Sequence, residues 1–117
     1  MPEPATPIAC TLSLARMSER LDEFHALFAG HLLALRRQPR RLTLTLSAPD
    51  GPAGVEAATR DLVARERQCC SFLSFTVNRS GAELLVDVEA PANAEPTLDA
   101  MQELAGRAAP HATRARR

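Results

Sequence analysis

Residues 41–47 read R-L-T-L-T-L-S, and this strict alternation of apolar and polar side chains decides the fold class. Alternation with a period of two places every second side chain on the same face of a β-strand. Residues 83–89, E-L-L-V-D-V-E, follow the same alternation except at Leu85. Both segments therefore predict strands with one face on a hydrophobic core. The inward set is Leu42, Leu44, Leu46, Leu84, Val86 and Val88.

Two further strands are expected. Phe75–Arg79 precedes the second alternating segment and forms a hairpin with it around the turn-rich run Asn78–Gly81. Near the N-terminus, Ile8–Leu14 reads I-A-C-T-L-S-L and also alternates. This N-terminal strand would place Cys10 toward the core.

Helical periodicity predicts three helices between and after these strands. The first begins after Ser18, a suitable N-cap, and ends at Arg36, Arg37 and the Gln38-Pro39 step. A second runs from about Val55 to Cys69, and a third from Ala92 to Ala105 with Asn93 as its cap. Apolar residues recur at three- and four-residue intervals along the first helix. Its stripe is Leu21, Phe24, Phe28, Leu32 and Leu35.

The predicted order is strand, helix, strand, helix, strand, strand, helix. We expect an α+β fold, a two-layer sandwich in which a four-stranded sheet carries the helices on one face. A chain of 117 residues suits one compact domain, which we place at residues 8–105. Residues 106–117 are expected to form a disordered, Arg-rich tail.

Composition argues against several function classes. All fourteen basic residues are Arg, and four of them lie in residues 107–117, so residues 1–106 carry ten Arg against fourteen acids, a net charge of −4. A domain with this negative net charge does not favour nucleic-acid binding. The absence of Trp and Tyr also leaves few aromatic side chains on which nucleic-acid bases could stack. We see neither a signal peptide nor an apolar run that could span a bilayer, and we expect a cytoplasmic protein.

The candidate site is the adjacent pair Cys69 and Cys70, with Cys10 as a third thiol. Cysteines stay reduced in the cytoplasm, so an odd set of three predicts metal-binding, catalytic or buried residues rather than a disulfide framework. Thiolates prefer soft ions, and three sulfur ligands suit mercury(II), arsenic(III) or copper(I). Zinc would need a fourth ligand, such as His25, His31 or a carboxylate.

Glu66 lies one helical turn before Cys69 and Cys70, and two functions other than ion binding use the same residues. In a thiol-dependent enzyme, redox or organometal-cleaving, Cys69 would be the nucleophile and Glu66 the proton donor. In a non-catalytic binding or homodimerisation module, the cysteines would be buried core residues. Glu66 would then be an exposed acid or an ion-pair partner.

The chain resembles small bacterial proteins, abundant in actinobacteria, that carry an I-A-C-T-L strand and an E-x-x-C-C-x-F-x-x-F motif. These read Ile8–Leu12 and Glu66–Phe75 here, and the Ala90-Pro91 pair also matches. Similar segments form the C-terminal portion of some mercury-resistance-type regulators. The resemblance, over residues 8–105, implies a soft metal or metalloid ion as the partner. Cys10, Cys69 and Cys70 would be its ligands, and Glu66 a supporting residue. The DNA-binding helices of a regulator are missing from this sequence, which implies binding, buffering or transfer of the ion.

Overall fold

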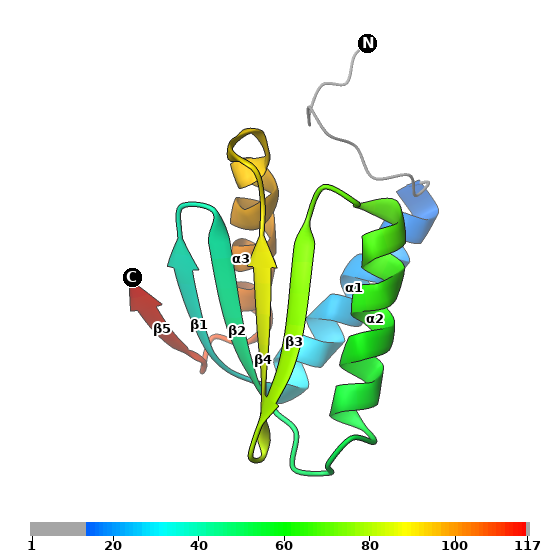
Figure 1. Cartoon of the computed structure of the whole chain (residues 1–117), viewed down its shortest axis with the longest axis vertical. Helices are drawn as coiled ribbons and strands as arrows, with labels where there is room; N and C mark the ends of the chain where they lie inside the picture. The colour runs from blue at the N-terminus through cyan, green and yellow to red at the C-terminus, as the bar shows by residue number, and fades with distance from the viewer. Residues whose placement is uncertain (1–13, 117) are drawn as a thin grey trace.

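A computed structural model describes the chain from residue 14 to residue 116, without the side chains of residues 14–17, 69 and 115–116. Three α-helices and a five-stranded mixed sheet make up this part of the chain (Figure 1). The strand order across the sheet is β3-β4-β2-β1-β5. The elements are α1 (Leu14–His31), β1 (Leu32–Gln38), β2 (Arg41–Ser47), α2 (Val55–Cys69), β3 (Ser74–Ser80), β4 (Glu83–Glu89), a 3-10 turn (Ala92–Ala94), α3 (Glu95–Ala108) and β5 (Thr113–Arg116).

The two alternating segments lie side by side in the middle of the sheet, as antiparallel strands β2 and β4. Leu44 pairs with Val86, and the next pairs on the same face, Leu42 with Val88 and Leu46 with Leu84, are also apolar. The leucines and valines of this face are almost fully buried, whereas Thr43 and Thr45 on the other face are half-buried. The prediction of strands with one face on the core is therefore confirmed.

All three helices cover the same face of the sheet. Phe24 of α1, Leu62 of α2 and Met101 of α3 line one small apolar cavity together with Leu44 and Val86 of the sheet. The core is thus a single layer of side chains between helices and strands, with the opposite sheet face uncovered by helix (Figure 1). The α+β class predicted from the sequence is observed, with five strands in place of four.

The first helix begins and ends earlier in the structure than the sequence predicted. Helix α1 begins at Leu14 and ends at His31, and the last two residues of the expected stripe, Leu32 and Leu35, lie on strand β1. Both are still buried, because an irregularity in the register between Leu32 and Ala34 allows two residues three positions apart to share the core face of the strand. Leu21 was expected in the core but is 48% exposed, since it lies on the outer side of α1.

Strand β1 was not predicted from the sequence. It pairs with β2 across a tight turn at Pro39-Arg40, with Gln38 opposite Arg41. Its sequence, L-L-A-L-R-R-Q, consists of strong helix formers, so the strand exists because of pairing with β2 rather than local preference.

The N-terminal strand expected at Ile8–Leu14 lies mainly outside the described residues, as does Cys10. Only Leu14 falls within them, and it begins helix α1 instead of ending a strand. The β3–β4 hairpin is present, but its turn is at Gly81-Ala82, because Asn78 and Arg79 still pair with β4.

The third helix is confirmed in outline, whereas the predicted disordered tail is not. A 3-10 turn precedes α3, and no side chain caps the helix, so Asn93 is not its cap. Helix α3 continues to Ala108, beyond the predicted end at Ala105. Thr113–Arg116 then forms β5, parallel to β1, because β1 offers an open edge that the returning chain can pair with. None of the described helices is long and apolar enough to cross a membrane.

Candidate functional site

Cys70 is held at the C-terminal end of helix α2. Its backbone N–H donates to the carbonyl oxygen of Glu66 at 2.7 Å, and its own carbonyl accepts from the N–H of Leu73 at 3.1 Å. The side chain is 1% exposed and belongs to the hydrophobic core. The turn from α2 into β3 therefore fixes Cys70 as an inward-facing residue.

Cys70 is disulfide-bonded. The sequence prediction of reduced thiols therefore differs from the structure at this residue. The expectation rested on the redox state of the cytoplasm, and amino-acid order carries no direct information on which sulfur atoms meet in the fold. The side chains of Cys69 and Cys10 lie outside the described part of the chain, so the three-sulfur arrangement remains a prediction.

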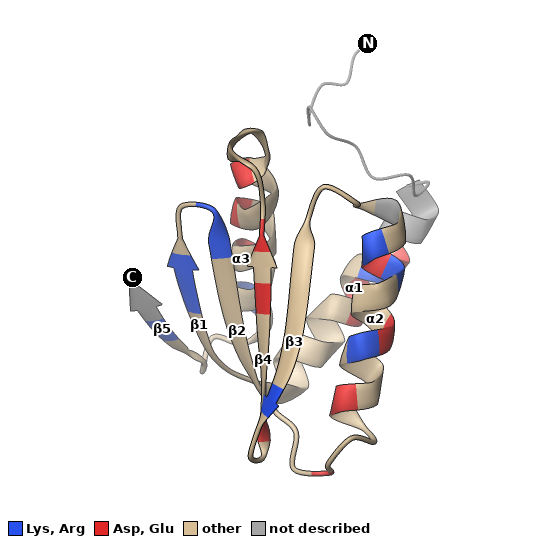
Figure 2. Cartoon of the chain, in the orientation of Figure 1, with Lys and Arg blue, Asp and Glu red and all other residues tan. Residues whose placement is uncertain are grey.

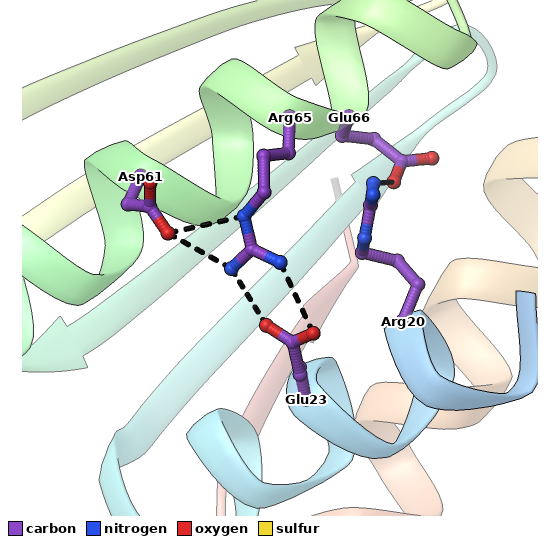
Figure 3. Close-up of polar contacts among 5 residues, drawn as sticks. All are labelled: Arg20, Glu23, Asp61, Arg65 and Glu66. Atoms are coloured by element: carbon purple, nitrogen blue, oxygen red, sulfur yellow. Dashed lines mark hydrogen bonds and ion pairs between the residues drawn. The ribbon is translucent and has the colours of Figure 1, made fainter. Parts of the chain in front are cut away.

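Glu66 is buried and forms an ion pair (Figure 3). Its Oε1 accepts a hydrogen bond from Nη1 of Arg20 at 2.8 Å, and the two side chains are only 11% and 13% exposed. Of the two structural roles expected for Glu66, that of ion-pair partner is observed. The carboxylate points across the α1–α2 interface toward the guanidinium.

Arg20 was not singled out from the sequence, although a signal for it exists. It lies four residues before Phe24, which in turn lies four before Phe28, so Arg20 occupies the buried stripe of α1. A charged residue on an apolar helical stripe requires an opposite charge nearby. The sequence separation of 46 residues hides which acid supplies it.

A second ion-pair cluster adjoins the first on the same interface (Figure 3). Arg65 of α2 donates two hydrogen bonds to Glu23 of α1, at 2.6 and 3.1 Å, and also pairs with Asp61 at 2.9 Å. The hydrogen bond from Arg65 lowers the pKa of Glu23, and burial acts in the opposite direction. The same hydrogen bond raises the pKa of Arg65. Figure 2 shows acidic and basic residues meeting where α1 and α2 pack.

Arg65 and Arg67 both make contacts beyond their own helix. Arg65 spans the α1–α2 interface, and the exposed Arg67 reaches from α2 to β3, where its Nη2 donates to the carbonyl oxygen of Phe75 at 2.6 Å. Phe75 is buried, and Phe72 is partly buried against the same hydrophobic core that contains Cys70.

The described residues hold no group of three His, Cys, Asp or Glu side chains placed to bind a metal ion. His25 and His111 are exposed and His31 is half-buried, so within this part of the chain none joins a cluster that could complete a zinc site. A metal site formed by Cys10, Cys69 and Cys70 would lie mostly outside the described side chains.

A hollow of about 330 Å³ beside α3 is lined by polar and charged residues such as Asp99, Glu103 and Arg114, and two other cavities of the described part are smaller. The apolar cavity in the core offers about 10 Å³, far below the roughly 300 Å³ of a small-molecule pocket. A shallow hollow of about 250 Å³ lies on the uncovered sheet face, between Arg36 and Leu85, away from Cys70. Neither cavity is lined by a cysteine.

Comparisons of the chain with protein-family models, curated proteins and solved structures find no match, so what it does must be inferred from its own residues.

Proposed function

We propose that the reduced chain binds a soft metal or metalloid ion, mercury(II), arsenic(III) or copper(I), through thiolates of Cys10, Cys69 and Cys70. Its role would be sequestration or sensing. The observation that carries the proposal is the disulfide bond of Cys70, because it requires two cysteine sulfur atoms to meet at the end of α2. Two or three sulfur ligands are the coordination that these ions favour.

The surroundings of Cys70 support a soft ion over a hard one. Leu73 and Phe75 are 4% and 6% exposed and lie beside it in the core, so few oxygen ligands or water molecules have access. Hard cations such as magnesium or calcium need six or more oxygen ligands and gain little at such a place. The resemblance of Glu66–Phe75 to mercury-resistance-type regulators points to the same class of ion.

Native mass spectrometry of the full chain tests the proposal. The protein is first reduced with a phosphine, which does not compete as a thiol, and is then exposed separately to mercury(II), arsenite, copper(I) and zinc(II). We expect one soft ion per chain and none after Cys70→Ser. The matched control is Ser71→Ala, which changes an exposed neighbour and should bind like the wild type.

A variant without the adjacent cysteine pair gives the result that would contradict the proposal. If a Cys69→Ser, Cys70→Ser double variant binds mercury(II) and arsenite as tightly as the wild type, the proposal fails. Because a serine in the core can impair folding, the far-UV circular dichroism of each variant is compared with the wild type. Cys70→Ala keeps the site apolar and is a second variant with the same expected loss.

A thiol-dependent enzyme is the second candidate, and the disulfide of Cys70 favours its redox form. The reduced chain would then transfer two electrons to a disulfide substrate. Reduction of insulin disulfides under a thiol reductant measures this activity. Turnover that disappears in Cys70→Ser supports the enzyme, and a rate equal to that of the reductant alone removes it.

For organometal cleavage, Glu66 would protonate the departing carbon. Its backbone lies one turn from Cys70, but its carboxylate is engaged with Arg20, so Arg20 would have to release it. Incubation with phenylmercury followed by gas chromatography for benzene decides the question. Benzene formation that is lost in Glu66→Gln would support this reaction.

A structural role for the cysteines is the third candidate, and the burial of Cys70 favours it. After reduction, the thiols would react with a chromogenic disulfide reagent only when the chain is unfolded. Rapid reaction of two or three thiols in the native protein counts against this role and in favour of an accessible site.

A further inference from the structure

The sheet face opposite the helices, called the open face below, is not covered by any described helix (Figure 1). Successive residues of a strand point to opposite faces, so the open-face side chains alternate along each strand with those of the core. On β2 the open-face residues are Arg41, Thr43, Thr45 and Ser47. The open face is therefore polar at its centre, and its charges and its shape can be compared strand by strand.

Two rows of side chains cross the three central strands of the open face. The register of β1 and β4 with β2 places Arg36, Thr43 and Asp87 in one row. The next row consists of Ala34, Thr45 and Leu85. Residues that pair directly across antiparallel strands point to the same face. Each row therefore lies on the open face, with β2 in its middle.

The first row has opposite charges at its two ends. On β4, Asp87 and Glu89 share Arg41 as their cation, at 3.6 and 3.0 Å, so negative charge is in excess there. On β1, Arg36 is exposed and forms no ion pair with a described residue. Figure 2 shows basic positions on β1 and β2 and acidic positions on β4. The unbalanced charges of the two signs thus lie on either side of β2.

The second row has a large apolar side chain at one end and a small one at the other. Leu85 of β4 is half-buried, and Ala34 of β1 borders the hollow of about 250 Å³ in the open face. Because Ala34 ends in a methyl group, the hollow beside it has room for an apolar side chain from another molecule. The row therefore carries both a projecting side chain and a place that could receive it.

We infer that two copies of the chain pair through their open faces as a homodimer, around a two-fold axis that runs along β2. Since β1 and β4 flank β2, this axis places β1 of each copy over β4 of the other. Each row keeps its level along the axis. Arg36 then faces Asp87 of the second copy, and Leu85 faces Ala34 of the second copy and the hollow beside it. Both contacts occur twice in the dimer.

The geometry of stacked sheets permits these contacts. Packed sheets lie about 10 Å apart, a gap that two facing side chains fill together. Their strand directions stay within about 30° of each other, and β1 and β4 are only one strand spacing from the axis, so the facing pairs remain close. A surface that is complementary to itself in charge and in shape is what a two-fold interface requires.

The size of the open face predicts a weak dimer. Five strands about 4.8 Å apart, with about 3.4 Å per residue, give roughly 500 Å² on each copy and about 1,000 Å² in total. This total is at the lower limit of specific interfaces. We therefore expect a dimer that dissociates on dilution and, because exposed charges are screened by salt, at high ionic strength.

Sedimentation velocity of the full chain tests the inference. The chain is kept reduced, so that no disulfide can join two copies, and interference optics are used because Trp and Tyr are absent. We expect the weight-average sedimentation coefficient to rise with concentration from the monomer value to the dimer value. A chain that stays monomeric up to its solubility limit overturns the inference. The dimer involves no cysteine, so that outcome would not affect the proposed ion site.

Charge reversal shows whether the open face is the interface. Arg36→Asp should weaken the dimer by at least about tenfold, because it places acids opposite each other at two sites. The matched control Arg107→Asp changes an exposed residue of α3 and should leave dimerisation unchanged. The double variant Arg36→Asp, Asp87→Arg should dimerise more tightly than Arg36→Asp alone. A folded double variant, checked by far-UV circular dichroism, that stays monomeric would contradict the two-fold axis along β2.

Truncation of Leu85 tests the second row. Leu85→Ala should weaken the dimer, whereas Leu21→Ala, at a side chain that is 48% exposed on α1, should not. A dimer that forms equally well in Arg36→Asp, Leu85→Ala and the wild type would show that the copies meet elsewhere, and it would overturn the assignment of the open face.

Discussion

Thr59 is the residue whose environment fits it least well. It lies on α2 and is 2% exposed, and its hydroxyl has no hydrogen-bond partner among the described residues. The hydroxyl borders the apolar core cavity, which is too small and too apolar to hold a well-bonded water molecule. A buried hydroxyl without a partner lowers the stability of the folded state.

We therefore predict that Thr59→Val stabilises the protein by about 1 kcal/mol, because it removes an unsatisfied polar group at almost constant shape. Urea denaturation followed by far-UV circular dichroism measures the change, since the chain lacks Trp and Tyr as fluorescent probes. Thr43→Val is the matched control. The Thr43 hydroxyl donates to Asp87 at 2.6 Å, so its removal should destabilise. Destabilisation by Thr59→Val would contradict this account.

At the level of elements, the α1–α2 interface depends on charges at its Cys70 end. Glu66 and Arg20 are both nearly buried, so removing Glu66 takes away an opposite charge that Arg20 contacts in the interior. We predict that Glu66→Ala costs about 2 to 4 kcal/mol in the free energy of unfolding, measured by urea denaturation.

Asp61→Ala provides the comparison on the same helix. Asp61 pairs with Arg65 but is 66% exposed, and exposed pairs contribute no more than about 1 kcal/mol. Equal changes in the free energy of unfolding for the two substitutions would contradict a larger contribution of the buried pair to the α1–α2 interface.

A second group of contacts joins α2 to the β3–β4 hairpin and makes stability depend on pH. Glu56 accepts hydrogen bonds from Arg79 at 2.7 Å and from Arg60 at 2.9 Å, while Arg79 also donates to the carbonyl oxygens of Gly51 and Gly81. The bond from Arg79, followed by that from Arg60, holds the pKa of Glu56 below its ordinary value of 4.5.

A pKa that is lower in the folded state adds stability above the unfolded value and loses it as the pH falls through the folded value. Glu56 and Glu23 should thus stabilise fully at neutral pH and progressively less below about 4.5. We predict that Glu56→Gln reduces the difference in unfolding free energy between pH 7 and pH 3, whereas Glu83→Gln, at an exposed position, leaves it unchanged. An unaltered difference in Glu56→Gln would contradict the assignment.

The elements also show what the sequence can predict. Strands β2 and β4 were predicted because alternation is a local pattern that matches their burial. Strand β1 was not predicted, because Leu32 and Leu35 continue the helical spacing of Phe24 and Phe28. Only the pairing of this segment with β2 makes it a strand and not the end of the helix. Strand β5 was also missed, because it forms by pairing with β1, its partner among the described strands.

The candidate site could likewise be predicted only in part. The one-turn spacing of Glu66 and Cys70 followed from helical periodicity, and the structure confirms it through their backbone hydrogen bond. The Arg20–Glu66 pair depends on how α1 packs against α2, which no local pattern encodes. Whether Cys10 joins Cys69 and Cys70 stays a prediction.

For the whole molecule, the helices cover one sheet face, and the start of α1 meets the end of α2 beside Cys70. The proposed ion site requires the sulfur atoms of Cys10 and Cys69 to lie at this same end of the α1–α2 interface. The functional account rests on that convergence of sulfur atoms.

A mercury titration of the reduced full chain, followed by thiolate-to-mercury charge-transfer absorption in the near ultraviolet, tests this convergence most directly. The chain has neither Trp nor Tyr, so the band is measured against a low background. The account predicts a sharp end point at one mercury per chain, which disappears in Cys70→Ser but not in Ser71→Ala. Absorption that rises without an end point, or an unchanged end point in Cys70→Ser, would contradict it.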